Sequence, residues 1–166
     1  RLLFADGTIQ FAGYIMNPDN IALKEAYGET TDVGGYQNRS RLTHATSAII
    51  GAFMACRRDV FEKVGGFDAE RFPIAFNDID FSLAVTELGY KNLYEPAITF
   101  HHLESKSRGY DALDAKKAER EQKEREIMRD KWGERLQSDP YYPEVFLKSE
   151  PTHSLLAAPK KAGITS

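Results

Sequence analysis

Residues 46–56, TSAIIGAFMAC, form a nearly continuous apolar run of strand length. A run of this kind is typical of a strand that is buried on both faces of a sheet. A short helix is expected over 57–64, and a second over 78–88, where Gly89 stops it. A further strand is expected over 90–100, with Pro96 indicating a sheet edge or a bulge. These segments predict an α/β fold, with a mixed sheet flanked by helices.

The segments before and after this central part of the chain have different sequence patterns. Residues 1–16 are expected to form two strands joined by a tight turn, whereas residues 17–41 lack a clear period and are expected to form a long irregular loop. A long C-terminal helix is expected over 111–137, with its polar first half in solvent. We expect one domain over residues 1–148 and a loosely ordered tail over 149–166.

Composition excludes several classes of protein. The chain has 166 residues, 42% apolar and 28% charged, which is typical of one packed domain. Its net charge of −3 gives no electrostatic support for nucleic-acid binding. No apolar run is long enough for a membrane span, and the first residues do not resemble a signal peptide. Because the chain lacks an initiator methionine, we expect residue 1 to be a fragment boundary. Cys56 is the single cysteine and is expected to be buried at the end of a strand, in a reducing compartment.

Two aspartates stand at the start of the second helix, in the sequence FNDIDF. Asn77 is a suitable N-cap, and Asp80 follows it at capping-box spacing. Asp78 is not needed as a cap, and about 200° of helix rotation separates it from Asp80. If one carboxylate faces a cleft, Asp78 is therefore the better candidate, and there it could accept a proton from a hydroxyl nucleophile. The alternative is a structural role, because aspartate is common at helix N-termini.

Two histidines end the strand over 90–100. Side chains of adjacent strand residues point to opposite faces, so only one of His101 and His102 can face a given site. Such a histidine could bind a divalent cation, or it could be an ordinary hydrogen-bonding residue. The following loop carries polar residues that could hold a phosphate-like anion, including Glu104, Ser107 and Arg108.

The order of these motifs resembles a known family. The segments GAFMACRRDVFEKVGGFDAERFPIAFNDIDF, LGYKNLYEPAITFHHLESKSRG and KWGERLQSDPYY resemble the C-terminal half of bacterial family 2 glycosyltransferases with the GT-A fold. The rhamnosyltransferase-like and polysaccharide-assembly members are the most similar. The resemblance covers residues 2–143 and implies a partial GT-A fold.

The resemblance also implies roles for individual residues. Asp78 matches the catalytic carboxylate, and His101 matches the histidine that helps to hold the metal or the donor diphosphate. Gly51 and Ala52 match the small pair that lets the sugar approach the backbone. The remaining residues expected to bind donor or acceptor are Asp80, Glu104, Ser107 and Arg108.

The implied activity is inverting transfer of a sugar from a nucleotide-diphosphate donor to a glycan or lipid-linked acceptor, with Mg²⁺ or Mn²⁺ as cofactor. The implied location is cytoplasmic, compatible with peripheral association at the inner face of the membrane. Three departures oppose a complete active site: Ala84 replaces a basic residue, Phe11 replaces a histidine, and the half that carries the Asp-x-Asp metal motif has no counterpart. We therefore expect the chain alone to be inactive. One alternative is a non-catalytic binding or assembly domain, and another is a metal-dependent hydrolase, which rests on the same Asp and His residues alone.

Overall fold

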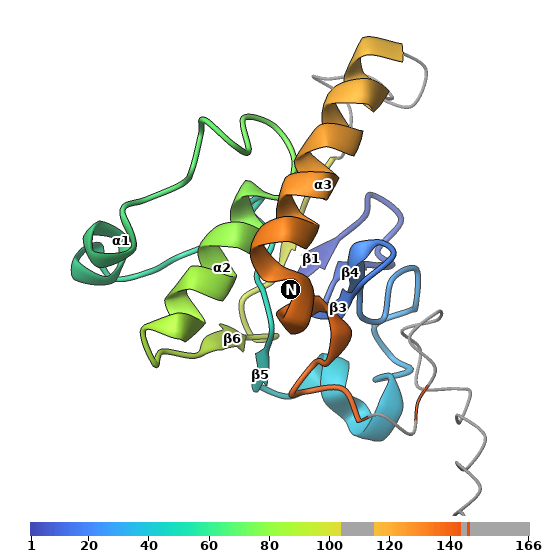
Figure 1. Cartoon of the computed structure of the whole chain (residues 1–166). Helices are drawn as coiled ribbons and strands as arrows, with labels where there is room; N and C mark the ends of the chain where they lie inside the picture. Colours follow the sequence, from blue (N-terminus) through green and yellow to red (C-terminus); the bar gives the residue numbers. More distant parts are fainter. Residues whose placement is uncertain (104–114, 144–145, 147–166) are drawn as a thin grey trace, which may run out of the picture.

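The computed structural model describes residues 1–103, 115–143 and 146, and within them the chain is a mixed α/β structure with small sheets and a long C-terminal helix (Figure 1). The strands are β1 (Leu2–Leu3), β2 (Ile9–Phe11), β3 (Tyr14–Asn17), β4 (Ile21–Lys24), β5 (His44–Thr46), β6 (Asn92–Tyr94) and β7 (Phe100–His101). The helices are α1 (Arg58–Val64), α2 (Asn77–Glu87) and α3 (Ala115–Gln137), with a 3-10 helix η1 (Tyr36–Arg41).

In the described part of the chain the strands form three small sheets. β1 lies between β2 and β7, antiparallel to β2 and parallel to β7, with Leu2 opposite both Phe11 and Phe100. β3 and β4 form an antiparallel hairpin, in which Tyr14 is opposite Lys24. β5 and β6 form a second antiparallel pair. The parallel pairing of β1 with β7 joins the two ends of the described segment 1–103.

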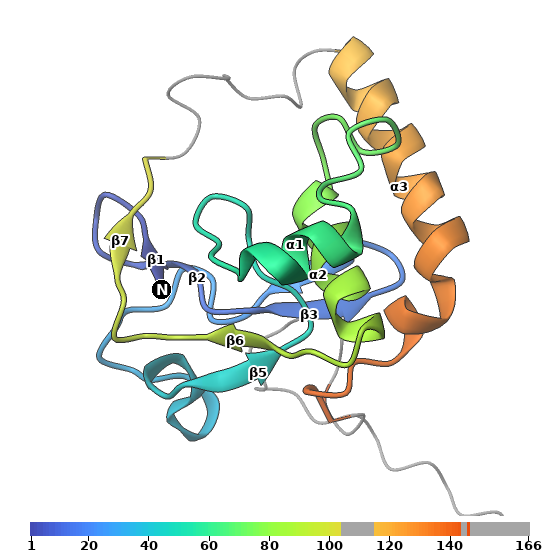
Figure 2. The same ribbon diagram turned by 90° about the vertical axis from the view of Figure 1, so that its left-hand side faces the viewer.

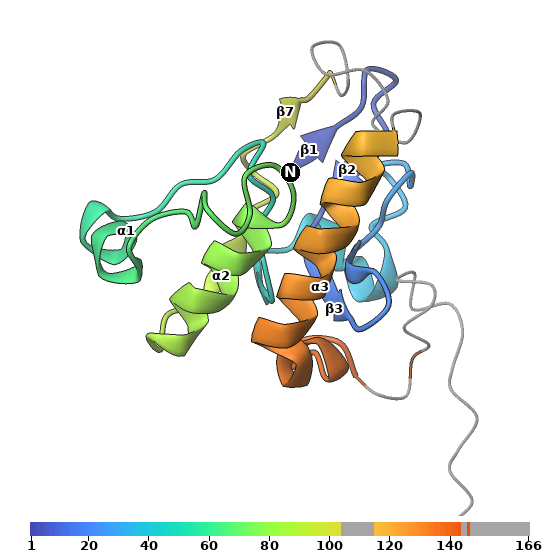
Figure 3. The same cartoon turned by 45° about the horizontal axis from the view of Figure 1, so that its top comes forward.

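The two longer helices lie side by side on one side of the strands (Figures 1 and 3). α1 packs against α2 at a distance from α3, as the turned view also shows (Figure 2). The main core fills the space between the β3–β4 hairpin, α2 and α3. Its buried residues are Met16, Ile21, Ala48, Phe72, Ile79, Leu83, Met128 and Leu136. Burial of these apolar side chains is what holds the helices on the strands.

The helix predictions were close to the structure. α1 ends at Gly65, which adopts the left-handed conformation that favours glycine there. α2 begins and ends one residue before the predicted bounds. α3 ends at Gln137 as predicted, and its predicted first residues, 111–114, lie outside the described residues, as does the predicted tail. Along its polar first half, ion pairs join Glu119 to Lys123 and Glu121 to Arg125 at i,i+4 spacing.

The strand predictions were less accurate. Of the predicted strand over 46–56, only Thr46 belongs to a strand, and Ala48 adds an isolated bridge to Tyr14. The backbone turns at Ile50–Phe53, where the Phe53 N–H donates to the Ile50 carbonyl. Cys56 is exposed, so its predicted burial was wrong.

The other strand segments also differ from the prediction. The expected loop over 17–41 contains β4 and η1, because Asn17 accepts two backbone N–H bonds and turns the chain back on β3. The second predicted strand is divided into β2 and β3 at Gly13, and Pro96 lies between β6 and β7.

Candidate functional site

Asp78 lies in the first turn of α2 and is held by two backbone N–H groups. The Gly51 N–H donates to Asp78 Oδ2 at 2.7 Å, and the Ile79 N–H donates to Asp78 Oδ1 at 2.8 Å. Gly51 fits there because it lacks a side chain: a Cβ at this position would lie 3.2 Å from Asp78 Cβ. The carboxylate therefore has a defined direction, against the turn formed by residues 50–53.

The protonation of Asp78 is perturbed by its surroundings. Burial raises the pKa of the Asp78 carboxyl above its ordinary value, and it outweighs the lowering effect of the Gly51 and Ile79 N–H groups. The positive charge of Lys24, at the end of β4, also acts to lower this pKa. A half-buried carboxyl with a raised pKa is chemically suited to accept and release a proton.

Asp80 has a structural environment that differs from the predicted cap. The Asp80 side chain is buried, and its Oδ1 accepts a hydrogen bond from Trp132 Nε1 at 2.7 Å. The same oxygen forms an ion pair with Lys131 Nζ at 2.7 Å. Asn77 is the first helical residue rather than the N-cap, and the preceding residue, Phe76, provides no side-chain cap. Asp80 thus joins α2 to α3, and Asp78 and Asp80 face different partners, as their helical spacing predicted.

The segment before α2 is held by a residue that the sequence pattern did not indicate. Glu124 of α3 is buried, and its Oε2 accepts the Ala75 N–H at 2.6 Å and the Ile74 N–H at 3.4 Å. The sequence pattern placed this half of the helix in solvent because charged residues surround Glu124. Glu124 is 49 residues from Ala75 and 50 residues from Ile74 in the sequence, and contacts over such separations leave no signal in local spacing.

The two histidines lie at the end of β7 and contact different partners. His101 Nδ1 is 3.0 Å from the Phe4 carbonyl oxygen, and His102 Nδ1 is 2.8 Å from Gln10 Oε1. The turn that contacts Asp78 also reaches β7, because the Phe53 and Phe100 rings pack with centroids 4.3 Å apart. Within the described residues no hydrogen bond or ion pair joins His101 to Asp78, and no group of three His, Cys, Asp or Glu side chains could hold a metal ion.

The other predicted binding residues divide into two groups. Gly51 and Ala52 lie in the exposed turn against Asp78. Glu104, Ser107 and Arg108 lie outside the described residues.

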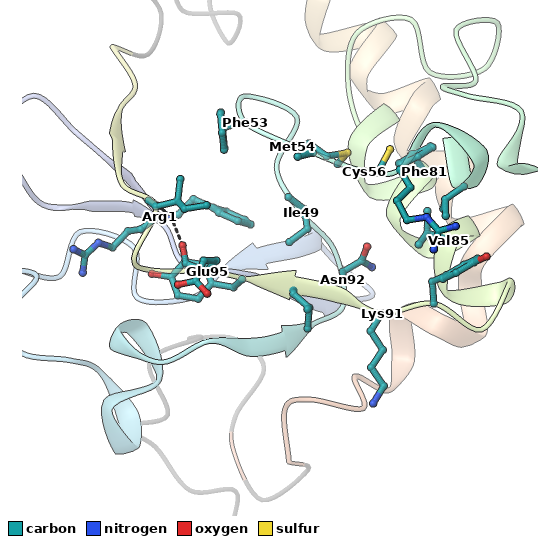
Figure 4. A pocket seen from close by; sticks show the side chains of 18 of the residues that line it. Arg1, Ile49, Phe53, Met54, Cys56, Phe81, Val85, Lys91, Asn92 and Glu95 are labelled. Atoms are coloured by element: carbon teal, nitrogen blue, oxygen red, sulfur yellow. Dashed lines mark hydrogen bonds between the residues drawn. The ribbon is translucent and has the colours of Figure 1, made fainter. Parts of the chain in front are cut away.

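A largely apolar cavity of about 370 Å³ lies beside this turn (Figure 4). The cavity lies between three parts of the chain: the turn at residues 50–53 with the segment after it, helix α2 and strand β6. Residues that line it include Ile49, Phe53, Met54, Cys56, Phe81, Val85, Asn92 and Leu93. Asp78 is not among the lining residues. The turn at residues 50–53 contacts the carboxylate through Gly51 and lines the cavity through Phe53. The titratable side chains that line the cavity include Lys91 and Glu95.

Comparison with known proteins gives two bacterial relatives. The chain is 32% identical over 142 residues to "Uncharacterized protein y4gI" of Sinorhizobium fredii (strain NBRC 101917 / NGR234). It is 30% identical over 117 residues to "O-antigen biosynthesis protein RfbC" of Myxococcus xanthus. These matches cover 86% and 68% of the chain, but only 16% and 9% of the two relatives. The chain is therefore a distant homologue of one segment of each large protein.

No family model and no solved structure matches the chain. In the part of the chain that the structure describes, none of the helices combines the length and the apolar character that crossing a bilayer requires.

Proposed function

We propose that this chain is the acceptor-side part of an inverting glycosyltransferase of bacterial polysaccharide assembly, with Asp78 as the general base. The observation that carries the proposal is the fixed, half-buried carboxylate of Asp78 with its raised pKa. The similarity to a protein named for O-antigen biosynthesis supports the pathway class. The resemblance of the motifs to family 2 enzymes supports a partial GT-A fold.

In the proposed reaction, an acceptor hydroxyl attacks the anomeric carbon of a nucleotide-diphosphate sugar. A new carbon–oxygen bond forms while the bond to the diphosphate breaks, and the diphosphate leaves with the bonding electrons. The hydroxyl proton passes to Asp78, which is free to accept it because each carboxylate oxygen accepts a single backbone N–H among the described residues. Attack opposite the leaving group inverts the anomeric centre.

The described residues do not by themselves fit a bound Mg²⁺ or Mn²⁺ ion. Among them, His101 belongs to no group of three His, Cys, Asp or Glu side chains, and its Nδ1 is already close to the Phe4 carbonyl. Metal dependence is therefore an expectation from the resemblance, and we derive no step from it.

The first test is titration calorimetry of the chain with UDP and dTDP, with and without Mn²⁺. We expect no binding near micromolar affinity, because the resemblance assigns donor binding to a half of the family's fold that residues 1–166 do not match. Metal-dependent binding near micromolar would contradict the acceptor-side assignment and would indicate that a donor site is present.

The decisive test is Asp78→Asn in the native polypeptide that contains residues 1–166, assayed for sugar transfer from UDP- and dTDP-sugars. Loss of a general base should lower kcat by about 100-fold or more. Asp130→Asn, at an exposed position on α3, is the matched control and should leave kcat unchanged. Equal rates in wild type and Asp78→Asn would sink the proposal.

A non-catalytic binding or assembly domain is the second candidate. It is favoured by the two backbone bonds to Asp78, because the same bonds would make this carboxylate a structural link between α2 and the turn at residues 50–53. In that case Asp78→Asn should lower stability while ligand binding persists.

A further inference from the structure

One face of α3 contacts the polypeptide on both sides of Asp78. Glu124, Met128 and Trp132 are spaced four residues apart and therefore lie on the same face of the helix. Glu124 binds the segment before α2, Met128 is fully buried in the core, and Trp132 binds the first turn of α2. This face of α3 thus spans the start of α2, where Asp78 lies (Figure 3).

On the N-terminal side of Asp78, the contact from α3 is made by the buried carboxylate of Glu124, which accepts hydrogen bonds from two backbone N–H groups. Glu124 is 2% exposed and accepts from Ala75 and Ile74, while Arg120 Nε lies 3.5 Å from the other carboxylate oxygen. A buried carboxylate is costly unless it is paired and hydrogen-bonded. Its position here is therefore coupled to the backbone conformation at residues 74–75.

The backbone conformation of Phe76, the residue that follows, is unusual. Phe76 has φ 60°, in the left-handed region that a bulky side chain rarely adopts. Its carbonyl accepts the Asp80 N–H at 2.8 Å, and the guanidinium of Arg125, next to Glu124 on α3, lies 5.2 Å from the centre of its ring. Strain of this kind persists only where the surroundings hold it, and here α3 supplies the contacts.

The contact after Asp78 is equally specific. Trp132 and Lys131 both bind the buried carboxylate of Asp80 at 2.7 Å. Helix α3 thus holds the backbone around Asp78 at two positions, Ala75 before it and Asp80 after it. The Asp78 carboxylate itself faces the N–H groups of Gly51 and Ile79 and the charge of Lys24.

We infer that Glu124 and Trp132 are positioning residues that hold Asp78 in the orientation needed to accept a proton. This inference rests on the proposed function, because the orientation matters for catalysis only if Asp78 is the general base. The positioning itself is a property of the folded chain and can be measured without activity.

The test is nuclear magnetic resonance of wild type, Glu124→Ala and Glu124→Gln, with Glu126→Ala, on the exposed side of the same helix, as control. The readouts are the amide signals of Gly51 and Ile79, which donate to Asp78, and the titration of the Asp78 carboxyl carbon. In Glu124→Ala we expect both amide signals to shift and the Asp78 titration to move toward the ordinary value, because water enters. Glu124→Gln keeps an oxygen acceptor for the Ala75 N–H and should restore both signals.

If Glu124→Ala does not fold, Trp132→Phe decides, since it removes the Nε1 donor and leaves Lys131 on Asp80. Unchanged Gly51 and Ile79 signals with an unchanged Asp78 titration in the folded variants would overturn the inference. In the transfer assay, Glu124→Ala should lower kcat by about tenfold to a hundredfold at nearly constant KM. Absence of transfer by wild type would count against the proposed function alone, because the resonance readouts do not depend on it.

Discussion

Gly51 is the residue whose identity the structure explains most directly. Its N–H donates to Asp78, and the space that a side chain would need is filled by the Asp78 Cβ at 3.2 Å and Oδ2 at 3.5 Å. Its backbone does not adopt a positive φ, so the requirement for glycine comes from close packing alone. Gly133, inside α3, is the opposite case, since a Cβ there would meet nothing within 4 Å.

This contrast gives a paired prediction. Gly51→Ala should lower the free energy of unfolding by about 1 kcal/mol, because overpacking outweighs the gain from a less flexible unfolded chain. Gly133→Ala should raise it by about 0.5–1 kcal/mol, because alanine favours the helix. Urea unfolding followed by far-ultraviolet circular dichroism measures both. If the two variants changed stability in the same direction, the close contact between Gly51 and Asp78 would not exist in solution.

At the same scale, helical geometry alone separated Asp78 from Asp80, and the structure gives the two carboxylates different partners. The partners themselves could not be predicted. Trp132 is 52 residues from Asp80, and contacts of that length leave no pattern in the local sequence. The capping-box prediction for Asp80 failed because a tertiary partner on α3 replaced the local one.

Among the elements, β4, η1 and β5 are joined by the buried carboxylate of Glu25. Arg39 Nε lies 2.7 Å from Glu25 Oε1, and His44 Nε2 lies 3.8 Å from Oε2, an ion-pair rather than a hydrogen-bond distance. Burial alone would raise the pKa of Glu25, but the neighbouring His44 and Arg39 outweigh it and hold this pKa below its ordinary 4.5. The irregular segment over 25–43 is thereby fixed to both sheets that it joins.

The lowered pKa predicts how stability depends on pH. A carboxyl with a folded-state pKa below its unfolded value stabilises the fold fully above the unfolded value, and this contribution is lost as pH falls through the folded one. Wild type should therefore lose stability relative to Glu25→Gln on acidification below about pH 4.5. At pH 7, Glu25→Gln should be less stable than wild type by about 2 kcal/mol.

Urea unfolding at a series of pH values measures this dependence, with Glu62→Gln, at an exposed position on α1, as control. A stability difference between wild type and Glu25→Gln that stayed constant from pH 7 to pH 3 would contradict the assigned ion pair.

Helices were predicted more accurately than strands for a physical reason. The ends of α1 and α2 are set by Gly65 and by Gly89, which also adopts a positive φ, and both signals lie within a few residues of the helix. A strand also requires a partner elsewhere in the chain. The β4 strand was missed because its partner is set by the turn after Asn17, and the run over 46–56 was overpredicted because apolar composition does not provide a neighbour.

For the whole molecule, burial and hydrogen bonding are unevenly distributed. The core between the β3–β4 hairpin, α2 and α3 contains fully buried residues such as Met128 and Leu83. On the other side of α2, Met54, Ala55 and Cys56 line the cavity, where Figure 4 labels Met54 and Cys56. Among the described residues the backbone N–H groups of these three make no hydrogen bonds. The same apolar character therefore produces a packed core in one place and an open cavity wall in the other.

Hydrogen exchange should reveal this difference, because amides without partners exchange without an unfolding event, whereas core helix amides exchange through rare opening of the structure. We expect the amides of Met54, Ala55 and Cys56 to exchange within the first time points at neutral pH. The amides of Leu83 and Met128 should be among the slowest. Exchange followed by nuclear magnetic resonance resolves each position, and Leu88, exposed at the end of α2, controls for fraying. Protection of Met54–Cys56 equal to that of Leu83 would mean that this run is a paired strand after all, as its composition predicts, and that the cavity beside it is closed in solution.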